Sequence, residues 1–197
     1  MIKVIAGKYK GTNLKVSKNS SVRPTSSSIK ESIFNIINSQ YLKVKDANLF
    51  SDKIILDAFA GSGALGLEAL SRGAKFCYFI EKDHKTNINL KENCNKILDN
   101  KSFKIINDDI NNLIKEDFFP IKTIDIAFFD PPYKYKYFDK TLVHLDSIGI
   151  LNNDALIIVE THYRNQPKES KYLKKMQEKI YGSTKLILYK LCRNYDK

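Results

Sequence analysis

Between residues 53 and 160, short apolar segments alternate with segments of helical periodicity, and this alternation constrains the fold more than any other feature. The apolar segments are five to seven residues long, the length of a buried strand. Strands and helices in regular alternation are typical of a parallel sheet covered by helices, so the fold class is α/β. We expect strands over 54–60, 75–81, 103–107, 124–130 and 155–160, and helices near 64–72, 84–98, 110–117 and 137–147.

Both ends of the chain carry a different pattern. Residues 174–191 contain two strand-like segments around a Gly-Ser pair, which predicts a C-terminal antiparallel hairpin. Residues 2–16 alternate polar and apolar side chains around two glycines, which predicts a small N-terminal hairpin with Lys8 and Lys10 near its tip. A polar loop then leads to residues 29–37, whose isoleucines share one helical face.

A glycine-rich segment, LDAFAGSGALG, follows the first expected strand. Gly61 and Gly63 lie at a strand-to-helix turn, where backbone can approach a ligand closely, and with Glu81, 20 residues after Gly61, they suit NAD and S-adenosylmethionine alike. Asp57, four residues before Gly61, favours S-adenosylmethionine, because a carboxylate repels a pyrophosphate and attracts a methionine ammonium. A capping role for Asp57 is the second interpretation.

Acidic residues also end the next two expected strands. Glu81 can accept hydrogen bonds from both ribose hydroxyls of either cofactor, so it does not discriminate between them. Asp109, or its neighbour Asp108, can accept from an adenine amino group, and one of the pair is expected to cap the helix that begins near residue 110.

The segment FFDPPY, residues 128–133, ends the fourth expected strand, at the edge where open α/β sheets bind ligands. An exocyclic amino nitrogen of a base is a poor nucleophile, and hydrogen bonds to the Asp130 carboxylate and the Pro131 carbonyl would orient it and stabilise developing positive charge. Pro132 has a fixed φ and no amide hydrogen, which helps to aim that carbonyl. Tyr133 offers a flat face on which an unstacked base can stack.

The charge of the chain is concentrated at its ends. The formal net charge is +11; residues 1–30 hold seven basic residues and no acidic one, and residues 163–197 hold ten and three. For the N-terminal thirty residues a polyanion such as nucleic acid is a reasonable partner. The three cysteines are scattered without a metal-ligand spacing, so no metal site is expected. No long apolar run or signal peptide is evident, and we expect a cytoplasmic protein with no membrane association.

These motifs together resemble the small-subunit methyltransferase D family, bacterial 16S rRNA guanine-N2 methyltransferases of the class I S-adenosylmethionine-dependent type. DPPY alone is shared with N6-adenine DNA methyltransferases, whereas the N-terminal blocks are more specific. The resemblance covers nearly the whole chain, through AGKYKG (6–11), RPT (23–25), KESIFNII (30–37), LDAFAGSGALGLEALSRGA (56–74), FIEKD (79–83), FFDPPY (128–133), IIVE (157–160) and YGSTKLILY (181–189).

The resemblance implies a Rossmann-like, mostly parallel seven-stranded sheet with a C-terminal antiparallel hairpin. It implies an RNA-contacting N-terminal appendage over residues 1–28 and a methyltransferase domain over residues 29–197. The substrate would be 16S rRNA within a small-subunit assembly particle, and we expect the enzyme to be a monomer. Matched by position, the cofactor residues are Asp57, Phe59, Gly61, Gly63, Glu81 and Asp109, with Asp108 unresolved against Asp109; the catalytic residues are Asp130, Pro131 and Tyr133; and the RNA contacts are Lys8, Lys10 and Arg23.

Three alternatives remain open at this point. An N6-adenine DNA methyltransferase shares DPPY, but 197 residues leave little room for a separate target-recognition domain. A non-catalytic RNA-binding module would explain the basic N-terminus but not the intact glycine and acidic motifs. An NAD enzyme would explain the glycines and Glu81 and leave DPPY without a role.

Overall fold

The computed structural model describes residues 2–16, 27–39, 49–113, 119, 123–132, 135, 137–167 and 172–193 of the chain. Arg23 and Tyr133 lie outside these ranges. The strands are β1 (Ile2–Lys3), β2 (Asn13–Leu14), β3 (Ile54–Asp57), β4 (Phe76–Ile80), β5 (Phe103–Ile106), β6 (Ile124–Phe129), β7 (Leu151–His162), β8 (Leu173–Tyr181) and β9 (Thr184–Leu191). The helices are α1 (Ser27–Ser39), α2 (Ala64–Ser71), α3 (His84–Ile97), the 3₁₀ turn η1 (Ile110–Asn112) and α4 (Phe138–Ser147).

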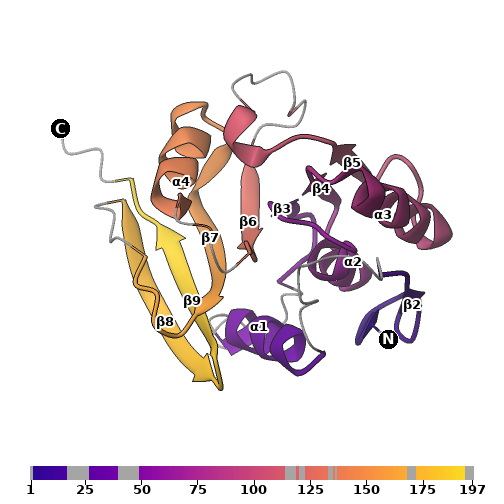
Figure 1. The fold of residues 1–197 in the computed structure, drawn as a ribbon, viewed down its shortest axis with the longest axis horizontal. Coiled ribbons are helices and arrows are strands. Elements are labelled where there is room, and N and C mark those ends of the chain that lie inside the picture. Colours follow the sequence, from indigo (N-terminus) through magenta and orange to yellow (C-terminus); the bar gives the residue numbers. More distant parts are fainter. Residues whose placement is uncertain are drawn as a thin grey trace.

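Seven strands form one sheet in the order β5-β4-β3-β6-β7-β9-β8, and β1 pairs with β2 in a separate hairpin (Figure 1). The first five strands of that order run parallel, and β9 is antiparallel to both of its neighbours. The chain order reverses at β3, because β4 and β5 lie on one side of it and β6 on the other. This reversal is the point at which open α/β sheets bind ligands, outside the carboxyl ends of the strands. The predicted fold class is confirmed.

Helices cover both faces of the sheet. Apolar side chains of α1, α2 and α3 join those of one sheet face in a single core cluster, which includes Phe34, Leu67 and Phe128. The opposite face packs against α4 and η1, with Phe129 and Leu142 among the buried residues. Strands β3, β4 and β6 are therefore covered on both sides, which explains their near-continuous apolar sequences.

Several boundaries differ from the predicted ones. The first strand ends at Asp57, three residues early, because the chain turns there into the glycine loop. The helix expected over 110–117 is a single 3₁₀ turn in the described residues, and positions 114–118 lie outside them. Strand β7 begins four residues before its apolar core and pairs with both β6 and β9. In the described residues, no helix is long and apolar enough to cross a membrane.

The N-terminal hairpin is anchored on α2 by one buried carboxylate. Glu68 is fully buried; its two oxygens accept hydrogen bonds from the backbone amides of Ile5, at 2.7 Å, and Ala6, at 2.9 Å. The same carboxylate pairs with Lys30 of α1 at 3.2 Å and with Arg72 at 3.0 Å. Burial lowers the pKa of Lys30, although the nearby carboxylate opposes that shift. Glu68 thus joins the hairpin, α1 and α2.

The tip of the hairpin also approaches α2 closely. The amide of Lys8 donates to the Ser71 carbonyl at 2.7 Å, and the amide of Tyr9 donates to the Ser71 hydroxyl at 2.9 Å. A Cβ at Gly7 would lie 1.8 Å from the Ser71 carbonyl oxygen, and the φ of Gly7 is +79°. Only glycine fits this position. The AGKYKG segment therefore forms a turn and also docks the hairpin on α2. The division into an appendage over residues 1–28 and a domain over residues 29–197 stays a prediction.

Candidate active site

The glycine loop between β3 and α2 has one open and one packed glycine. Gly61 has a φ of +53°, and a Cβ added there would meet nothing within 4 Å. A Cβ at Gly63 would lie 2.6 Å from the side chain of Leu90, so that glycine lets α2 and α3 pack closely. Gly66 is similarly crowded by Phe79 of β4. Of the three glycines, Gly61 is therefore the one that leaves room for a ligand.

Glu81 ties this loop to the end of β4. Its carboxylate accepts from the amide of Gly61 at 2.9 Å and from the amide of Asp83 at 2.8 Å. Each carboxylate oxygen has a second lone pair, so these two bonds leave acceptor capacity for ribose hydroxyls. The structure thus brings the two sequence-predicted residues, 20 positions apart, into direct contact.

Asp57 is buried at the end of β3, with 1% of its surface exposed. One oxygen accepts from the amide of Gly66, in the first turn of α2, at 2.9 Å. This bond is the capping contact given above as the second interpretation of Asp57. The contact between Asp57 and a methionine ammonium stays a prediction. Burial raises the pKa of Asp57 to about 7; the Gly66 bond opposes this rise, whereas the negative charges of Asp130 and Glu81 add to it. A bound cation would offset all three unfavourable influences.

Asp108 and Asp109 both stabilise the start of η1. Asp109 is its N-cap: one oxygen accepts from the amide of Asn111 at 3.0 Å, and the other pairs with Lys82 at 3.1 Å. Asp108 accepts from the amide of Asp109 at 2.7 Å and from Asn112 at 3.1 Å. The expected cap is therefore Asp109. Which of the two carboxylates contacts adenine stays a prediction.

The segment that follows β6 places Asp130 and Pro131 beside the glycine loop between β3 and α2. Strands β3 and β6 are neighbours, and the amide of Ala58 donates to the Phe128 carbonyl at 3.0 Å. The turn after the prolines is closed by a 2.7 Å bond from the Tyr135 amide to the carbonyl of Pro132, not of Pro131. Phe59 contacts the Tyr135 ring edge-on, with 4.9 Å between centroids, and thereby packs the glycine loop against this segment.

Four acidic residues lie at the carboxyl ends of neighbouring strands on one face of the sheet. In the strand register Asp57 is level with Phe79, Phe128 and, through Phe128, Ile158. These three apolar residues belong to the core cluster of α1 and α2. Because side chains alternate along a strand, residues two positions later face the same way. Those residues are Glu81, Asp130 and Glu160, which with Asp57 we call the acidic edge.

Glu160 is the member of the acidic edge that was not predicted as a site residue. Its signal is present in the sequence: IIVE ends an apolar strand with an acid, as do IILD, FIE and FFD. Glu68 was also missed, and in its case the sequence gives no signal, because its partners at Ile5 and Ala6 are more than 60 residues away. Among the described residues, no group of three or more histidine, cysteine or acidic side chains could hold a metal ion.

Comparison with known proteins identifies the family. The family model described as conserved hypothetical protein 95 matches residues 2–190. The chain is 32% identical to ribosomal RNA small subunit methyltransferase D of Escherichia coli, over 95% of this chain and 89% of that protein. It is 36% identical to the Buchnera aphidicola protein of the same name, over 81% of this chain and 75% of that protein. The chain belongs to this methyltransferase family.

A solved structure extends this result to three dimensions. An Escherichia coli protein described as a methyltransferase is 30% identical and has a TM-score of 0.79, with 97% of this chain and 98% of that chain covered. The methyltransferase family membership makes the chain an enzyme with S-adenosylmethionine as its cofactor. The site fits that group, since Gly61 leaves open space next to the Glu81 carboxylate, and the buried carboxylate of Asp57 lies where the same loop begins.

Replacing Asp57 by asparagine tests the predicted ammonium contact. Asparagine can still accept from the Gly66 amide but carries no charge, so S-adenosylhomocysteine should bind about tenfold more weakly or worse in calorimetry. The matched control is 5′-methylthioadenosine, which has no ammonium and should bind both proteins equally. Because folding raises the pKa of Asp57 from 3.8 to about 7, this carboxyl costs stability progressively between those two pH values and in full at pH 8. The uncharged variant should therefore not melt lower at pH 8. Unchanged affinity for both ligands would limit Asp57 to capping.

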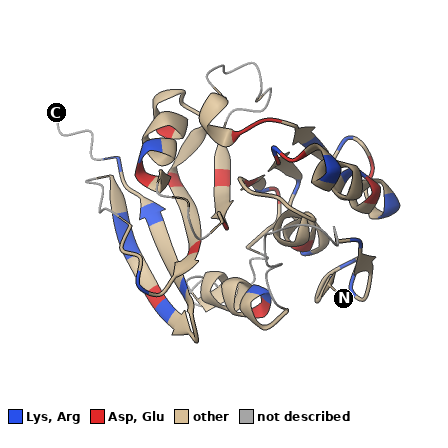
Figure 2. Cartoon of the chain, viewed as in Figure 1, with Lys and Arg blue, Asp and Glu red and all other residues tan. Residues whose placement is uncertain are grey.

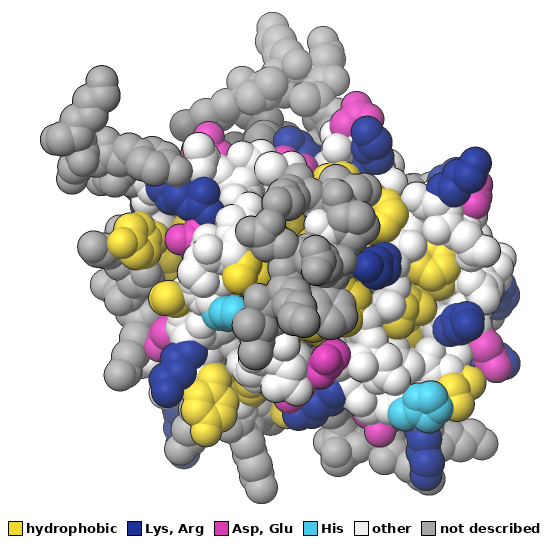
Figure 3. All heavy atoms as spheres, turned by 90° about the horizontal axis from the view of Figure 1, so that it is seen from above, with side chains coloured by type: hydrophobic (Ala, Val, Ile, Leu, Met, Phe, Trp, Pro, Cys, Tyr) yellow, Lys and Arg dark blue, Asp and Glu magenta, His cyan; other side chains and the backbone are white. Residues whose placement is uncertain are grey.

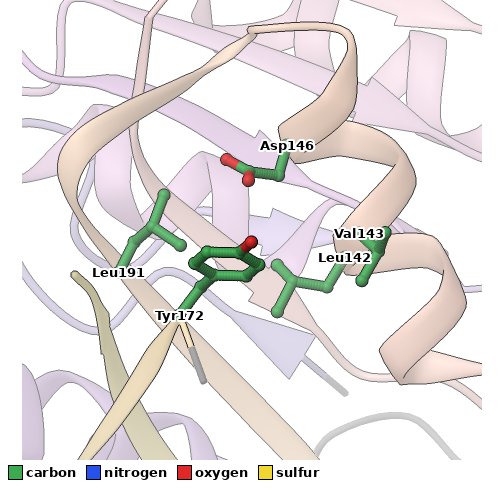
Figure 4. Close-up of a pocket in the computed structure, with 5 residues that line it drawn as sticks. All are labelled: Leu142, Val143, Asp146, Tyr172 and Leu191. Carbon is green, nitrogen blue, oxygen red and sulfur yellow. The ribbon is translucent and has the colours of Figure 1, made fainter. Parts of the chain in front are cut away.

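One further depression lies elsewhere on the surface, between α4 and the C-terminal hairpin. Leu142, Val143, Tyr172 and Leu191 line it with Asp146 (Figure 4). The Asp146 carboxylate is bound by Arg193, with the guanidinium Nε at 2.8 Å. None of the predicted site residues lines this depression, so it is separate from the acidic edge.

Proposed function

We propose that this enzyme transfers a methyl group from S-adenosylmethionine to the N2 amino group of a guanine in small-subunit rRNA, within an assembly particle. The observation that carries the proposal is the position of Asp130 and Pro131, directly beside the glycine loop that holds Gly61. Two hydrogen-bond acceptors next to a cofactor pocket suit an amino group as the methyl acceptor. The names of the relatives supply the class of RNA.

The residues after β6 orient the amino nitrogen. The Asp130 carboxylate and the Pro131 carbonyl accept its two hydrogens, which holds the nitrogen toward the methyl group and stabilises positive charge as the new bond forms. When held at Gly61 and Glu81, S-adenosylmethionine would supply its methyl group to the nitrogen as an electrophile and would leave as S-adenosylhomocysteine. The proton lost from N2 would pass to water or to Asp130. Tyr133 is proposed to stack on the base.

Two of the three cysteines are unsuited to act as nucleophiles. Cys77 and Cys94 are fully buried, and burial raises both thiol pKa values, that of Cys94 to about 12. A thiol without a thiolate fraction at neutral pH is a weak nucleophile. Direct transfer to nitrogen, without a covalent enzyme intermediate, agrees with these environments.

The docked turn of the N-terminal hairpin is proposed as an RNA contact. Lys8 and Lys10 are exposed there, and the Lys8 ammonium lies 5.2 Å from the centre of the Tyr9 ring. Elsewhere the charges are mixed: basic and acidic side chains share the margin of the face in Figure 3, and Figure 2 shows both signs along α3. Two lysines and an aromatic ring on a turn fixed to α2 can bind a phosphate backbone. Arg23, the third predicted RNA contact, lies outside the described residues.

Charge reversal at Lys8 and Lys10 should weaken rRNA binding and make it less salt-dependent. If both lysines neutralise phosphates, the slope of log affinity against log salt should fall by about one to two units. Reversal of Lys174 and Lys179, exposed on β8, is the matched control and should leave the slope unchanged. Filter binding at several salt concentrations measures this. An equal change in both variants would mean that only the net charge of the protein matters.

The competing DNA hypothesis is tested by substrate comparison. The enzyme is given tritiated S-adenosylmethionine with either unmodified small-subunit particles or duplex DNA. Label in RNA alone is the expected result. Label in DNA alone would support an N6-adenine DNA methyltransferase instead, and absence of cofactor binding would support a non-catalytic RNA-binding module.

A further inference from the structure

Glu160 has a buried carboxyl group that the transfer reaction, as described above, does not use. Its residue is 7% exposed, and its Oε2 atom has no hydrogen-bond partner among the described residues. Leaving a buried polar atom unpaired costs about 1–3 kcal/mol, so such atoms are uncommon in folded proteins. Where one occurs at a functional edge of a fold, a missing ligand is a natural explanation.

The position of Glu160 connects it to the reaction. In the register of β6 and β7, Phe129 is paired with Val159, so Asp130 and Glu160 are the next residues on adjacent strands. Phe128 and Ile158 share the core cluster on the α1 face, and the alternation of side chains directs Asp130 and Glu160 to that same face. Glu160 therefore lies beside Asp130 within the acidic edge, close enough for the negative charge of Asp130 to act on it.

The hydrogen-bond acceptors of Asp130, Pro131 and Glu160 match the N–H donors of only one common base, guanine. Guanine presents three neighbouring N–H donors, two on N2 and one on N1. Asp130, Pro131 and Glu160 together offer three acceptors. Adenine and cytosine present an amino group beside a ring nitrogen that is itself an acceptor, which an acceptor on the protein would repel.

We propose that Glu160 accepts a hydrogen bond from N1–H of the target guanine and so selects guanine over other bases with an amino group. This inference rests on the proposed function, because it takes guanine N2 as the methyl acceptor. The bond gives the Glu160 carboxyl group a partner only when the base is bound. Glu160 is thus a specificity-determining residue, whereas Asp130 and Pro131 hold the reacting nitrogen.

Because the raised pKa of Glu160 leaves its carboxyl mostly protonated at neutral pH, the bound base must stabilise the carboxylate form. Burial, and then the negative charge of Asp130, raises the pKa of Glu160 to about 8. A donor on the bound base stabilises the carboxylate form and brings this pKa down. A neutral Glu160 carboxyl would instead donate from its hydroxyl to N1 of adenine. The base that the enzyme prefers therefore shows whether Glu160 is charged or neutral in the complex.

A base analogue separates the selection of the base by Glu160 from the positioning of the amino group by Asp130 and Pro131. Once mapping of labelled oligonucleotide fragments has located the target guanine, small-subunit particles are reconstituted with 2,6-diaminopurine at that position; this base keeps the 2-amino group and has an acceptor at N1. The wild-type enzyme should methylate guanine at least about a hundredfold faster than the analogue. In Glu160→Gln the carboxamide can turn either its oxygen or its NH₂ toward the base. The preference should therefore fall below about tenfold, partly through a faster reaction on the analogue.

A control variant and two contrary results of Glu160→Gln decide the proposal. Glu178→Gln, which removes a carboxylate two strands away on β8, is the control and should keep the wild-type preference. An equal loss of rate on both bases in Glu160→Gln would indicate a structural role and overturn the proposal, as would an unchanged preference. A melting temperature within about 3 °C of wild type, expected because no bond to Oε2 is lost, excludes misfolding as the cause. Failure of the proposed function itself would show separately, as absence of N2 methylation by the wild-type enzyme.

Discussion

Replacing Asp130 by alanine should reduce the rate of methyl transfer by at least about a hundredfold while S-adenosylhomocysteine still binds. The variant loses the carboxylate that orients the amino nitrogen and stabilises charge in the transition state, and losing one such group typically costs 10²–10³ in rate. Single-turnover transfer to small-subunit particles measures the first quantity, and calorimetry measures the second. Cofactor binding should persist because the contacts of Glu81 with the glycine loop remain intact.

The control for this variant lies on the same strand. Asp125, near the start of β6, accepts from the amide of Ile54 at 2.9 Å and pairs with Lys53 at 3.2 Å. It is at the opposite end of the strand from Asp130, so Asp125→Asn should keep full activity per folded molecule. If Asp130→Ala lost rate and cofactor affinity by the same factor, Asp130 would belong to the cofactor pocket rather than to the site of the base.

Replacing Glu68 by alanine should lower the free energy of unfolding by about 3–5 kcal/mol. The substitution leaves Lys30, which is fully buried, without its carboxylate, and breaking a buried ion pair on one side carries a cost of this size. The amides of Ile5 and Ala6 lose their acceptors as well. Urea denaturation followed by circular dichroism measures the change.

Two further variants isolate the cause. Glu92→Ala removes an exposed carboxylate that pairs with Lys15, and such surface pairs contribute about 0–1 kcal/mol. Combining Glu68→Gln with Lys30→Met removes the buried charge altogether and should recover part of the lost stability. A loss below about 1 kcal/mol in Glu68→Ala would mean that the hairpin is held mainly by its apolar contacts.

Sequence reasoning succeeded where a local pattern determines the structure. Strands β3, β4 and β6 are short apolar segments with an acid at their carboxyl ends, so topology alone brings Asp57, Glu81 and Asp130 to one edge. The glycine loop was recognisable because a strand-to-helix turn requires particular backbone conformations, as the φ of Gly61 shows. The bond between Glu81 and the Gly61 amide then follows from the adjacency of β3 and β4.

Sequence reasoning failed where distant residues determine the role of a side chain. Glu68 lies in a helical segment, and its sequence neighbours give no sign that it is buried. It is buried because the hairpin docks on it through the Ile5 amide and because Lys30 pairs with it. The bond from the Gly66 amide to Asp57 depends on how α2 begins, so the sequence could offer capping only as one of two roles for Asp57. The helix expected near residue 110 is a short 3₁₀ turn in the described residues, because Asp109 caps a single turn there.

The proposed reaction is tested most directly by methyl transfer from tritiated S-adenosylmethionine to small-subunit particles that lack this modification, followed by nucleoside analysis of the labelled rRNA. We expect N2-methylguanosine, which would establish the substrate class, the base and the target atom in one measurement. Label in N6-methyladenosine would keep the cofactor site but contradict the assignment of the base and the role of Glu160. No label in rRNA at all would contradict the proposed function.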